Sequence, residues 1–151
     1  MSDMFAVPHG AVVVTESPAG GYAQIVHTET HDFLADEPLS AGGEDLGPDP
    51  YRLLLAALGT CTSMTLRMYA TRKQWKLDRI EVRLRHDRVH AKDCADCPDK
   101  DVVVDRITRD ILLEGDLDDE QRRRLLEIAD RCPVHRTLTG TIRVASALVS
   151  E

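Results

Sequence analysis

The stretch from Asp49 to Lys73 constrains the fold of this chain most strongly, because it joins a helix start signal to an uninterrupted apolar run. Asp49 is a residue type that caps helices, and Pro50 follows at the first helical position, where a missing N–H costs nothing. Leu53 to Leu58 are six consecutive apolar residues. A helix that is apolar on all sides is expected to be buried on all sides. The sequence therefore predicts a long, buried, central helix.

Cys61 lies in the middle of this predicted helix, and we interpret its thiol as the candidate reactive group. At helical spacing it is in phase with apolar residues, which places it in the core. The residues in phase with it are Leu54, Ala57, Leu58, Met64 and Met68. A second ridge of the helix consists of small residues, which let another helix or strand approach closely. This ridge is formed by Ala56, Gly59, Thr60 and Ser63.

Strand and helix patterns follow one another along the rest of the chain. Strands are predicted where β-branched residues gather between turn signals, or where apolar and polar residues alternate. Asp118 and Gln121 form a capping-box pattern for a second helix that ends before Pro133. The predicted strands are residues 11–16, 21–28, 31–37, 79–90, 102–113 and 137–144. The order βββ-α-ββ-α-β predicts an α+β fold in a single domain over residues 1–151.

The charge and the hydropathy of the chain exclude several classes of partner. A net charge of −7 argues against nucleic acid, since phosphates are bound by basic surfaces. No apolar run reaches the roughly 18–20 residues of a membrane span. The first residues lack the basic start and the apolar core of a signal peptide. We therefore expect a cytoplasmic protein with no nucleic-acid or membrane partner, whose 4 cysteines begin as thiols.

Cys132 is the second thiol that the patterns place in the core, in phase with Leu125, Ile128 and Ala129 of the second helix. Two inward-facing thiols in a small core can meet. One can then attack a peroxide, and the other can condense with the resulting sulfenic acid to a disulfide. At a helix C-terminus the macrodipole disfavours a thiolate, which suits Cys132 to the resolving role. Alternatively, both cysteines are buried thiols that only fill space.

Cys94 and Cys97 form a C-x-x-C pair close to His90, with His86 upstream. This spacing is typical of metal ligands, and Zn²⁺ would take the two cysteines, His90 and one more ligand. No second C-x-x-C pair completes a zinc site. A loop disulfide or two unpaired surface thiols fit the same residues, so no cofactor is predicted.

Two segments of the chain together resemble a known family. GPDPYRLLLAALGTCTSMTLRMYA around Cys61, and CPVHRTL beginning at Cys132, are similar to the OsmC/Ohr family of organic hydroperoxide reductases and osmotically induced proteins. The resemblance covers nearly the whole chain. It implies an α+β intertwined homodimer, with the long helices in the centre and the active sites at the subunit interface. It also implies that Cys61 is the peroxidatic cysteine and Cys132 the resolving one.

The chain departs from the peroxidase members of that family in the groups around the peroxidatic cysteine. Those members use an Arg from the N-terminal region and a Glu ten positions before the cysteine to stabilise the thiolate. Here Tyr51 stands ten positions before Cys61, and residues 1–51 contain no Arg. A thiol in mid-helix needs a neighbouring cation to ionise. The candidates are Arg52, His27, His31, His135 and a residue of the partner subunit.

Two functions follow as hypotheses. In the first, the protein is a thiol-dependent peroxidase that reduces organic hydroperoxides through a Cys61 sulfenate and a Cys61–Cys132 disulfide, which an external dithiol reduces. Apolar walls around Cys61 would favour an organic peroxide over hydrogen peroxide. In the second, Cys61 is an unreactive thiol that lines the pocket of a non-catalytic protein, which binds a small apolar molecule or senses redox state.

Overall fold

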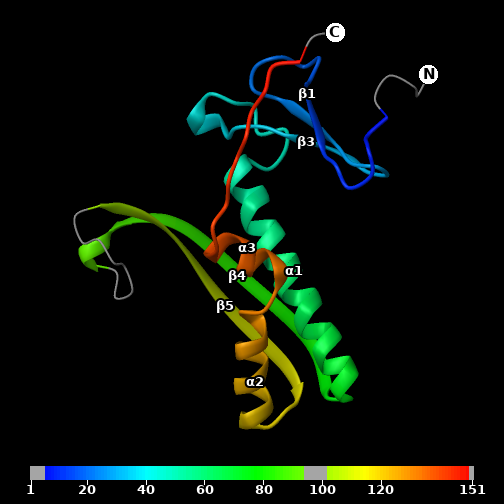
Figure 1. The fold of residues 1–151 in the computed structure, drawn as a ribbon, viewed down its shortest axis with the longest axis vertical. Coiled ribbons are helices and arrows are strands. Elements are labelled where there is room, and N and C mark those ends of the chain that lie inside the picture. Colours follow the sequence, from blue (N-terminus) through cyan, green and yellow to red (C-terminus); the bar gives the residue numbers. More distant parts are fainter. Residues whose placement is uncertain (1–5, 94–101, 150–151) are drawn as a thin grey trace. The chain divides into compact units, whose positions relative to one another are not determined.

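The computed structural model describes residues 6–93 and 102–149, and the chain divides into two compact units, residues 1–54 and 55–151. The boundary between the units falls inside the long helix α1, Pro50–Lys73 (Figure 1). Both helices and antiparallel sheets are present, which confirms the predicted α+β class. The single domain over residues 1–151 stays a prediction.

The N-terminal unit contains a three-stranded antiparallel sheet in the order β1-β2-β3. Its elements are β1 (Val13–Glu16), β2 (Gln24–His27), β3 (Asp32–Ala35) and the short 3-10 helix η1 (Leu39–Ala41). The three strands predicted for this part of the chain are confirmed, although each is shorter than its sequence pattern. The register pairs Glu16 with Gln24 at the turn between β1 and β2.

Asp36 organises the loop that follows β3. Its side chain accepts hydrogen bonds from the backbone N–H groups of Glu37 (2.8 Å), Glu44 (3.0 Å) and Leu46 (3.3 Å). Asp36 is only 3% exposed. Burial acts to raise the pKa of this carboxyl, but the three backbone donors outweigh it and hold the pKa below its ordinary value.

Helix α1 begins where the sequence predicted, with Asp49 Oδ1 accepting from the backbone N–H of Arg52 at 2.9 Å. The helix is buried along one face only, and the buried residues are Leu58, Thr62, Leu66 and Ala70. On another face, Met64 is 64% and Met68 63% exposed. The prediction that the helix is buried on every side is therefore wrong for this chain. The reason is that an all-round apolar helix here meets neighbouring elements of its own chain on one side only.

Length and composition alone would let α1 cross a membrane, contrary to the expectation that no segment of the chain is long and apolar enough. The core helices of soluble proteins meet the same criterion, so a single helix of this kind is weak evidence for a membrane span.

In the C-terminal unit, β4 (Lys76–His90) and β5 (Val103–Asp116) form a long two-stranded antiparallel ribbon, and η2 (Ala91–Asp93) follows β4. The alternation predicted for the first strand is confirmed, since Ile80, Val82 and Leu84 are half-buried. The small-residue ridge of α1 also has its predicted effect at Gly59. A Cβ at that position would lie 2.8 Å from Leu84 Cδ1, so the glycine lets β4 approach the helix closely.

Helix α2 (Asp119–Ala129) has the predicted capping box. Asp118 Oδ1 accepts from the backbone N–H of Gln121 at 2.8 Å, and Gln121 Oε1 accepts from that of Asp118 at 2.9 Å. The buried face of α2 packs with α1 and the ribbon (Figure 1). Their shared core consists of Leu66, Ala70, Leu77, Leu117, Leu125, Ile128 and Ala129. Truncation of a fully buried leucine to alanine in such a core costs about 2–5 kcal/mol.

Helix α3 (Pro133–Thr139) replaces the strand that was predicted over residues 137–144. That prediction was wrong. Helix α2 already ends at Ala129, short of Cys132, and Pro133 occupies the first position of a new helix with Cys132 as its N-cap. Residues 140–149 form neither helix nor strand. Although apolar and polar residues alternate in this segment, it pairs with no strand of the two described sheets. The order of the described strands and α-helices is therefore βββ-α-ββ-α-α.

Candidate functional site

Cys61 is half-buried on α1 and lines an apolar groove with a volume of about 740 Å³. The groove is formed by α1, by α2 and by the start of α3. Its apolar lining residues are Ala57, Met64, Met68, Ile128, Pro133 and Val134. The thiol is therefore open to a hollow of the size that holds a small organic molecule.

Two cations line the same groove, Arg72 in the last turn of α1 and Arg131 between α2 and α3. Tyr69 lines it as well, and Arg124 Nε donates to the Tyr69 hydroxyl at 3.1 Å, a hydrogen bond that lowers the pKa of Tyr69. Among the described residues, none donates a hydrogen bond to the sulfur of Cys61.

Cys132 is fully buried, and two groups contact its sulfur. The backbone N–H of His135 donates to Sγ at 3.3 Å, and Thr62 Oγ1 lies 3.8 Å from the same atom. Cys132 is the N-cap of α3 and lies beyond the end of α2 at Ala129. The helix-dipole argument that placed this cysteine at a C-terminus, where a thiolate is disfavoured, therefore does not apply.

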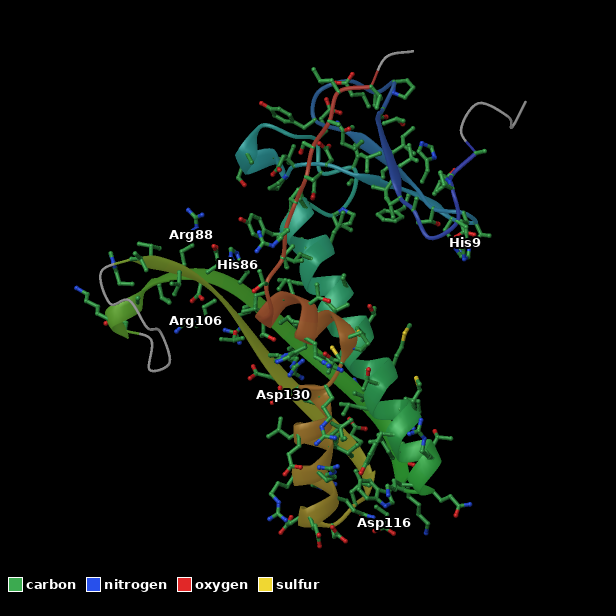
Figure 2. The ribbon with its side chains drawn as sticks, viewed as in Figure 1. His9, His86, Arg88, Arg106, Asp116 and Asp130 are labelled. Atoms are coloured by element: carbon green, nitrogen blue, oxygen red, sulfur yellow. The ribbon has the colours of Figure 1, made fainter. Side chains whose placement is uncertain are left out.

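Arg109, on β5, joins the groups around Cys132 to one another. Its Nη1 donates to Thr62 Oγ1 at 3.0 Å and to the backbone oxygen of Ala129 at 3.3 Å. Its Nη2 donates to Asp130 Oδ1 at 2.7 Å, at the end of α2 (Figure 2). The Arg109 side chain is only 11% exposed. A cation that donates to three groups from such a position fixes their geometry.

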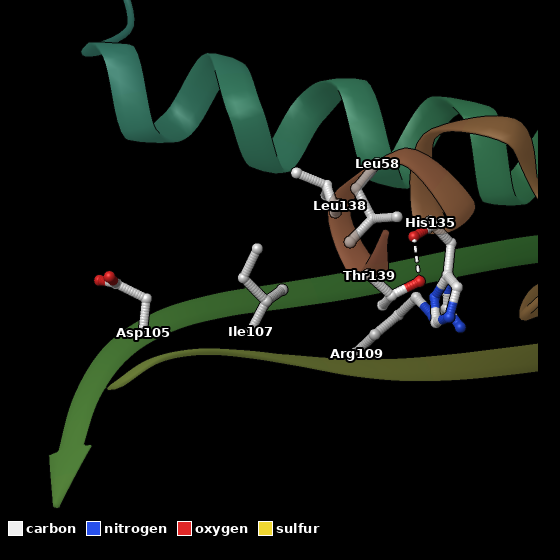
Figure 3. A pocket seen from close by; sticks show the side chains of 7 residues that line it. All are labelled: Leu58, Asp105, Ile107, Arg109, His135, Leu138 and Thr139. Atoms are coloured by element: carbon white, nitrogen blue, oxygen red, sulfur yellow. Dashed lines mark hydrogen bonds between the residues drawn. The ribbon is translucent and has the colours of Figure 1, made fainter. Parts of the chain in front are cut away.

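A second, smaller hollow of about 250 Å³ opens on the Arg109 side of these groups (Figure 3). Arg109 and His135 form one end of it, and Thr139 Oγ1 donates to the backbone oxygen of His135 at 2.8 Å. None of the residues that line this hollow lines the groove at Cys61. The two cysteines therefore have different surroundings, an open apolar groove for Cys61 and a buried polar cluster for Cys132.

Adjacent residues connect these two surroundings. Thr62, which follows Cys61, contacts the sulfur of Cys132. Pro133, which follows Cys132, lines the groove together with Cys61. The fold thus brings the middle of α1 to the corner between α2 and α3, although 70 residues separate Thr62 from Cys132. Both cysteines are free thiols.

The cations suggested by the sequence lie outside the groove lining. Arg52 pairs with Asp49 at 3.2 Å, and His27 pairs with Asp32 at 3.1 Å. His31 belongs to the N-terminal unit as well. His135 lines the smaller hollow and not the groove.

Sequence reasoning missed Arg72, Arg109, Arg131 and Thr62. For Arg109 the sequence did contain a signal. The residue alternates in phase with Ile107 and Ile111 along β5, on the half-buried side of the strand. A charged residue in an apolar phase is a candidate for a structural or functional cluster.

Cys94 and Cys97 lie outside the described residues, so a zinc site or a disulfide in that loop stays a prediction. His86 Nε2, upstream of that loop, contacts Asp105 Oδ1 at 2.8 Å. In the part of the chain that the structure describes, no group of three or more His, Cys, Asp or Glu residues is placed to hold a metal ion.

Comparison with known proteins agrees with this arrangement of elements. The family model described as OsmC-like protein matches residues 42–147. No curated protein matches the chain significantly.

Solved structures share the fold at low sequence identity. The OsmC-like protein of Mycoplasma pneumoniae has 16% identity and a TM-score of 0.67, covering 86% of each chain. A putative osmotic stress induced and detoxification response protein of Psychrobacter arcticus has 18% identity and a TM-score of 0.65, covering 83% of this chain and 85% of that one. The organic hydroperoxide resistance protein OhrB of Bacillus subtilis has 22% identity and a TM-score of 0.57, with coverage of 86% and 91%.

Proposed function

Because this chain belongs to the OsmC-like protein family, we propose that it is a thiol-dependent peroxidase that reduces organic hydroperoxides through Cys61. One observation carries the proposal: the Cys61 thiol opens into an apolar groove that also holds two arginines. The name of the Bacillus subtilis neighbour, an organic hydroperoxide resistance protein, supports the same chemistry and a role in stress response.

In the proposed reaction the Cys61 thiolate attacks the terminal oxygen of the hydroperoxide. The O–O bond breaks, the organic oxygen leaves with the electron pair and takes a proton, and Cys61 becomes a sulfenic acid. Cys132 then attacks the Cys61 sulfur, an S–S bond forms, and the sulfenic oxygen leaves as water. An external dithiol reduces the disulfide and is itself oxidised to a disulfide. We place this cycle in the cytoplasm, where such reductants are maintained.

Arg131 takes the role of the cation that the Cys61 thiolate needs. It lines the same groove as the thiol, and a thiolate gains stability next to a guanidinium. Arg72 lines the groove too, but it lies about 16 Å further along the axis of α1 than Cys61. This assignment replaces the missing Arg of the N-terminal region with a residue of the C-terminal unit.

The walls of the groove set the substrate preference. Met64, Met68 and Val134 offer apolar contact to the organic part of a hydroperoxide, and hydrogen peroxide has no such part. We therefore expect a higher kcat/KM for a bulky organic hydroperoxide than for hydrogen peroxide.

The protein is also proposed to be a homodimer. Met64 and Met68 expose an apolar strip of α1, and the β4–β5 ribbon has only two strands, an arrangement that is marginal without further packing. A second copy packed against this side of α1 would bury the strip. The dimer agrees with what the family resemblance implies.

The test of the function is a peroxidase assay with cumene hydroperoxide and a dithiol on the wild type, Cys61→Ser and Cys132→Ser. We expect Cys61→Ser to lose turnover. We expect Cys132→Ser to accumulate a sulfenic acid at Cys61, which dimedone traps as an adduct of defined mass. Full peroxidase activity in Cys61→Ser would overturn the proposal.

A second candidate function, a non-catalytic binding or redox-sensing protein, is favoured by one observation. The described residues give the Cys61 sulfur no hydrogen-bond donor. In that case the groove would bind a small apolar molecule with the thiol as part of its wall. Labelling with iodoacetamide at neutral pH separates the two functions, because a thiolate reacts quickly and a protonated thiol slowly.

A further inference from the structure

We propose that Arg109 and Thr62 form a positioning pair that stabilises the thiolate of Cys132, and that Cys132 is the leaving group when the Cys61–Cys132 disulfide is reduced. This inference rests on the proposed function, since it concerns the return half of the same cycle. It gives Arg109, which has no function in the proposed peroxide step, a function in the reduction of the disulfide.

The hydroxyl of Thr62 can form a hydrogen bond with Cys132 both when Cys132 is a thiol and when it is a thiolate. The Thr62 hydroxyl has one proton and two lone pairs. It donates to the backbone oxygen of Leu58 at 2.7 Å and accepts from Arg109 Nη1 at 3.0 Å. One lone pair remains for the Cys132 thiol, which lies 3.8 Å away. When Cys132 is a thiolate, rotation of the hydroxyl turns its proton from Leu58 to the sulfur.

Arg109 keeps its hydrogen bond to Thr62 in both states and polarises the hydroxyl toward a negative charge. Thr62 and Cys132 are both fully buried, so water does not compete for the sulfur. With the backbone N–H of His135, the thiolate would have two donors. Hydrogen bonds to a charged acceptor in a buried site are stronger than those to a neutral one.

The difference in exposure decides which sulfur the reductant attacks. Cys61 opens into the groove, whereas Cys132 is fully buried. A reductant therefore reaches Cys61, and Cys132 must leave. In thiol–disulfide exchange, the better stabilised thiolate leaves faster.

A thiolate of the external dithiol attacks Cys61 Sγ and forms a mixed disulfide, while the Cys61–Cys132 bond breaks and Cys132 leaves with the electron pair. The second thiol of the reductant then attacks the first sulfur of the reductant, which is bonded to Cys61, and Cys61 leaves as a thiolate. The reductant is oxidised to a disulfide, and each cysteine takes up a proton if it returns to the thiol.

The experiment forms the disulfide without any peroxide. Purified full-length protein is oxidised with diamide, the Cys61–Cys132 bond is identified by peptide mass, and its reduction by dithiothreitol is followed by quenching with acid. We expect Thr62→Val to slow the reduction by at least about tenfold, because it keeps the shape of the side chain but removes the donor. Thr62→Ser restores the hydroxyl and should restore most of the rate.

Arg109→Gln should slow the reduction to a similar degree, and Arg122→Gln is its matched control. Arg122 is also half-buried, and it donates to three backbone oxygens, those of Leu113, Gly115 and Leu117, with no contact to Cys132 or Thr62. A merely structural effect would appear equally in both arginine variants and in their thermal unfolding.

A monothiol such as 2-mercaptoethanol identifies the attacked sulfur, and we expect its trapped mixed disulfide at Cys61. An adduct at Cys132, or reduction of Thr62→Val at the wild-type rate, would overturn the inference. So would failure of diamide to form the bond, whereas the peroxide step at Cys61 is tested separately by trapping of its sulfenic acid. Conversely, a disulfide that diamide forms but organic hydroperoxide does not would sink the peroxidase proposal and leave this inference intact.

Discussion

Thr62 Oγ1, not the sulfur of Cys61, lies 3.8 Å from Cys132 Sγ in the reduced protein. Successive residues of an α-helix point about 100° apart, so α1 presents Thr62 to the buried corner and Cys61 to the groove. The consequence is a division of labour in the proposed cycle. The peroxide meets Cys61 among apolar side chains, while Cys132 is kept in a polar cluster that includes Arg109.

The first prediction concerns the cation of the groove. Replacement of Arg131 by glutamine should lower the rate constant for sulfenic acid formation at Cys61 by about three- to tenfold, because a thiolate loses a nearby positive charge. Stopped-flow measurement with an organic hydroperoxide in the Cys132→Ser background isolates this step.

Arg123→Gln is the matched control, since Arg123 is exposed on α2 and does not line the groove. Equal rates for Arg131→Gln and Arg123→Gln would show that the activating cation lies elsewhere.

Local signals in the sequence were sufficient to predict the starts of α1 and α2. Asp49 and Asp118 both act as helix caps, because a cap depends on residues within one turn of the chain. The alternation of apolar and polar residues was likewise sufficient to predict strand β4. For α3, the sequence contained a proline that begins a new helix after α2 has ended at Ala129. The strand-like residues after α3 have no partner strand in the described sheets.

The polar cluster could not be predicted from local patterns, because its members are far apart in the chain. Thr62 meets Arg109 across 47 residues and Cys132 across 70. Small polar residues such as Thr62 occur in many helices without a partner. Only the packing of β5 and the α2–α3 corner on α1 shows which of them is buried and bonded.

The second prediction concerns the exposed strip of α1. Met68→Glu should convert the proposed dimer to a monomer, because it would bury a charge in an apolar interface. Light scattering during size-exclusion chromatography measures the mass directly. Leu126→Glu serves as control, since Leu126 is 59% exposed on α2 and stands outside the strip. If Met68→Glu keeps the mass of the wild type, α1 does not form the interface.

The third prediction concerns the loop after β3. Because the folded-state pKa of Asp36 is lowered, its carboxylate contributes stability above the ordinary pKa of about 3.8, and this contribution is lost as pH falls through the folded-state pKa. Asp36→Asn replaces one accepting oxygen by an NH₂ group that faces backbone N–H donors. We expect the variant to be less stable than the wild type at pH 7, and the difference to shrink as the pH is lowered into the acid range.

Denaturant unfolding at a series of pH values measures this difference, and Glu44→Gln is a control because that side chain is exposed in the same loop. A stability gap between Asp36→Asn and the wild type that does not change with pH would contradict the assignment.

If Cys61 and Cys132 are the redox pair of this protein, an organic hydroperoxide should join them in a disulfide without any other oxidant. The reduced protein is mixed with one equivalent of an organic hydroperoxide, and in parallel with hydrogen peroxide, then alkylated and mapped by peptide mass without reduction. We expect a Cys61–Cys132 disulfide within seconds, formed faster by the organic hydroperoxide than by hydrogen peroxide. Both cysteines recovered as alkylated thiols, while Cys94 and Cys97 become oxidised, would contradict it.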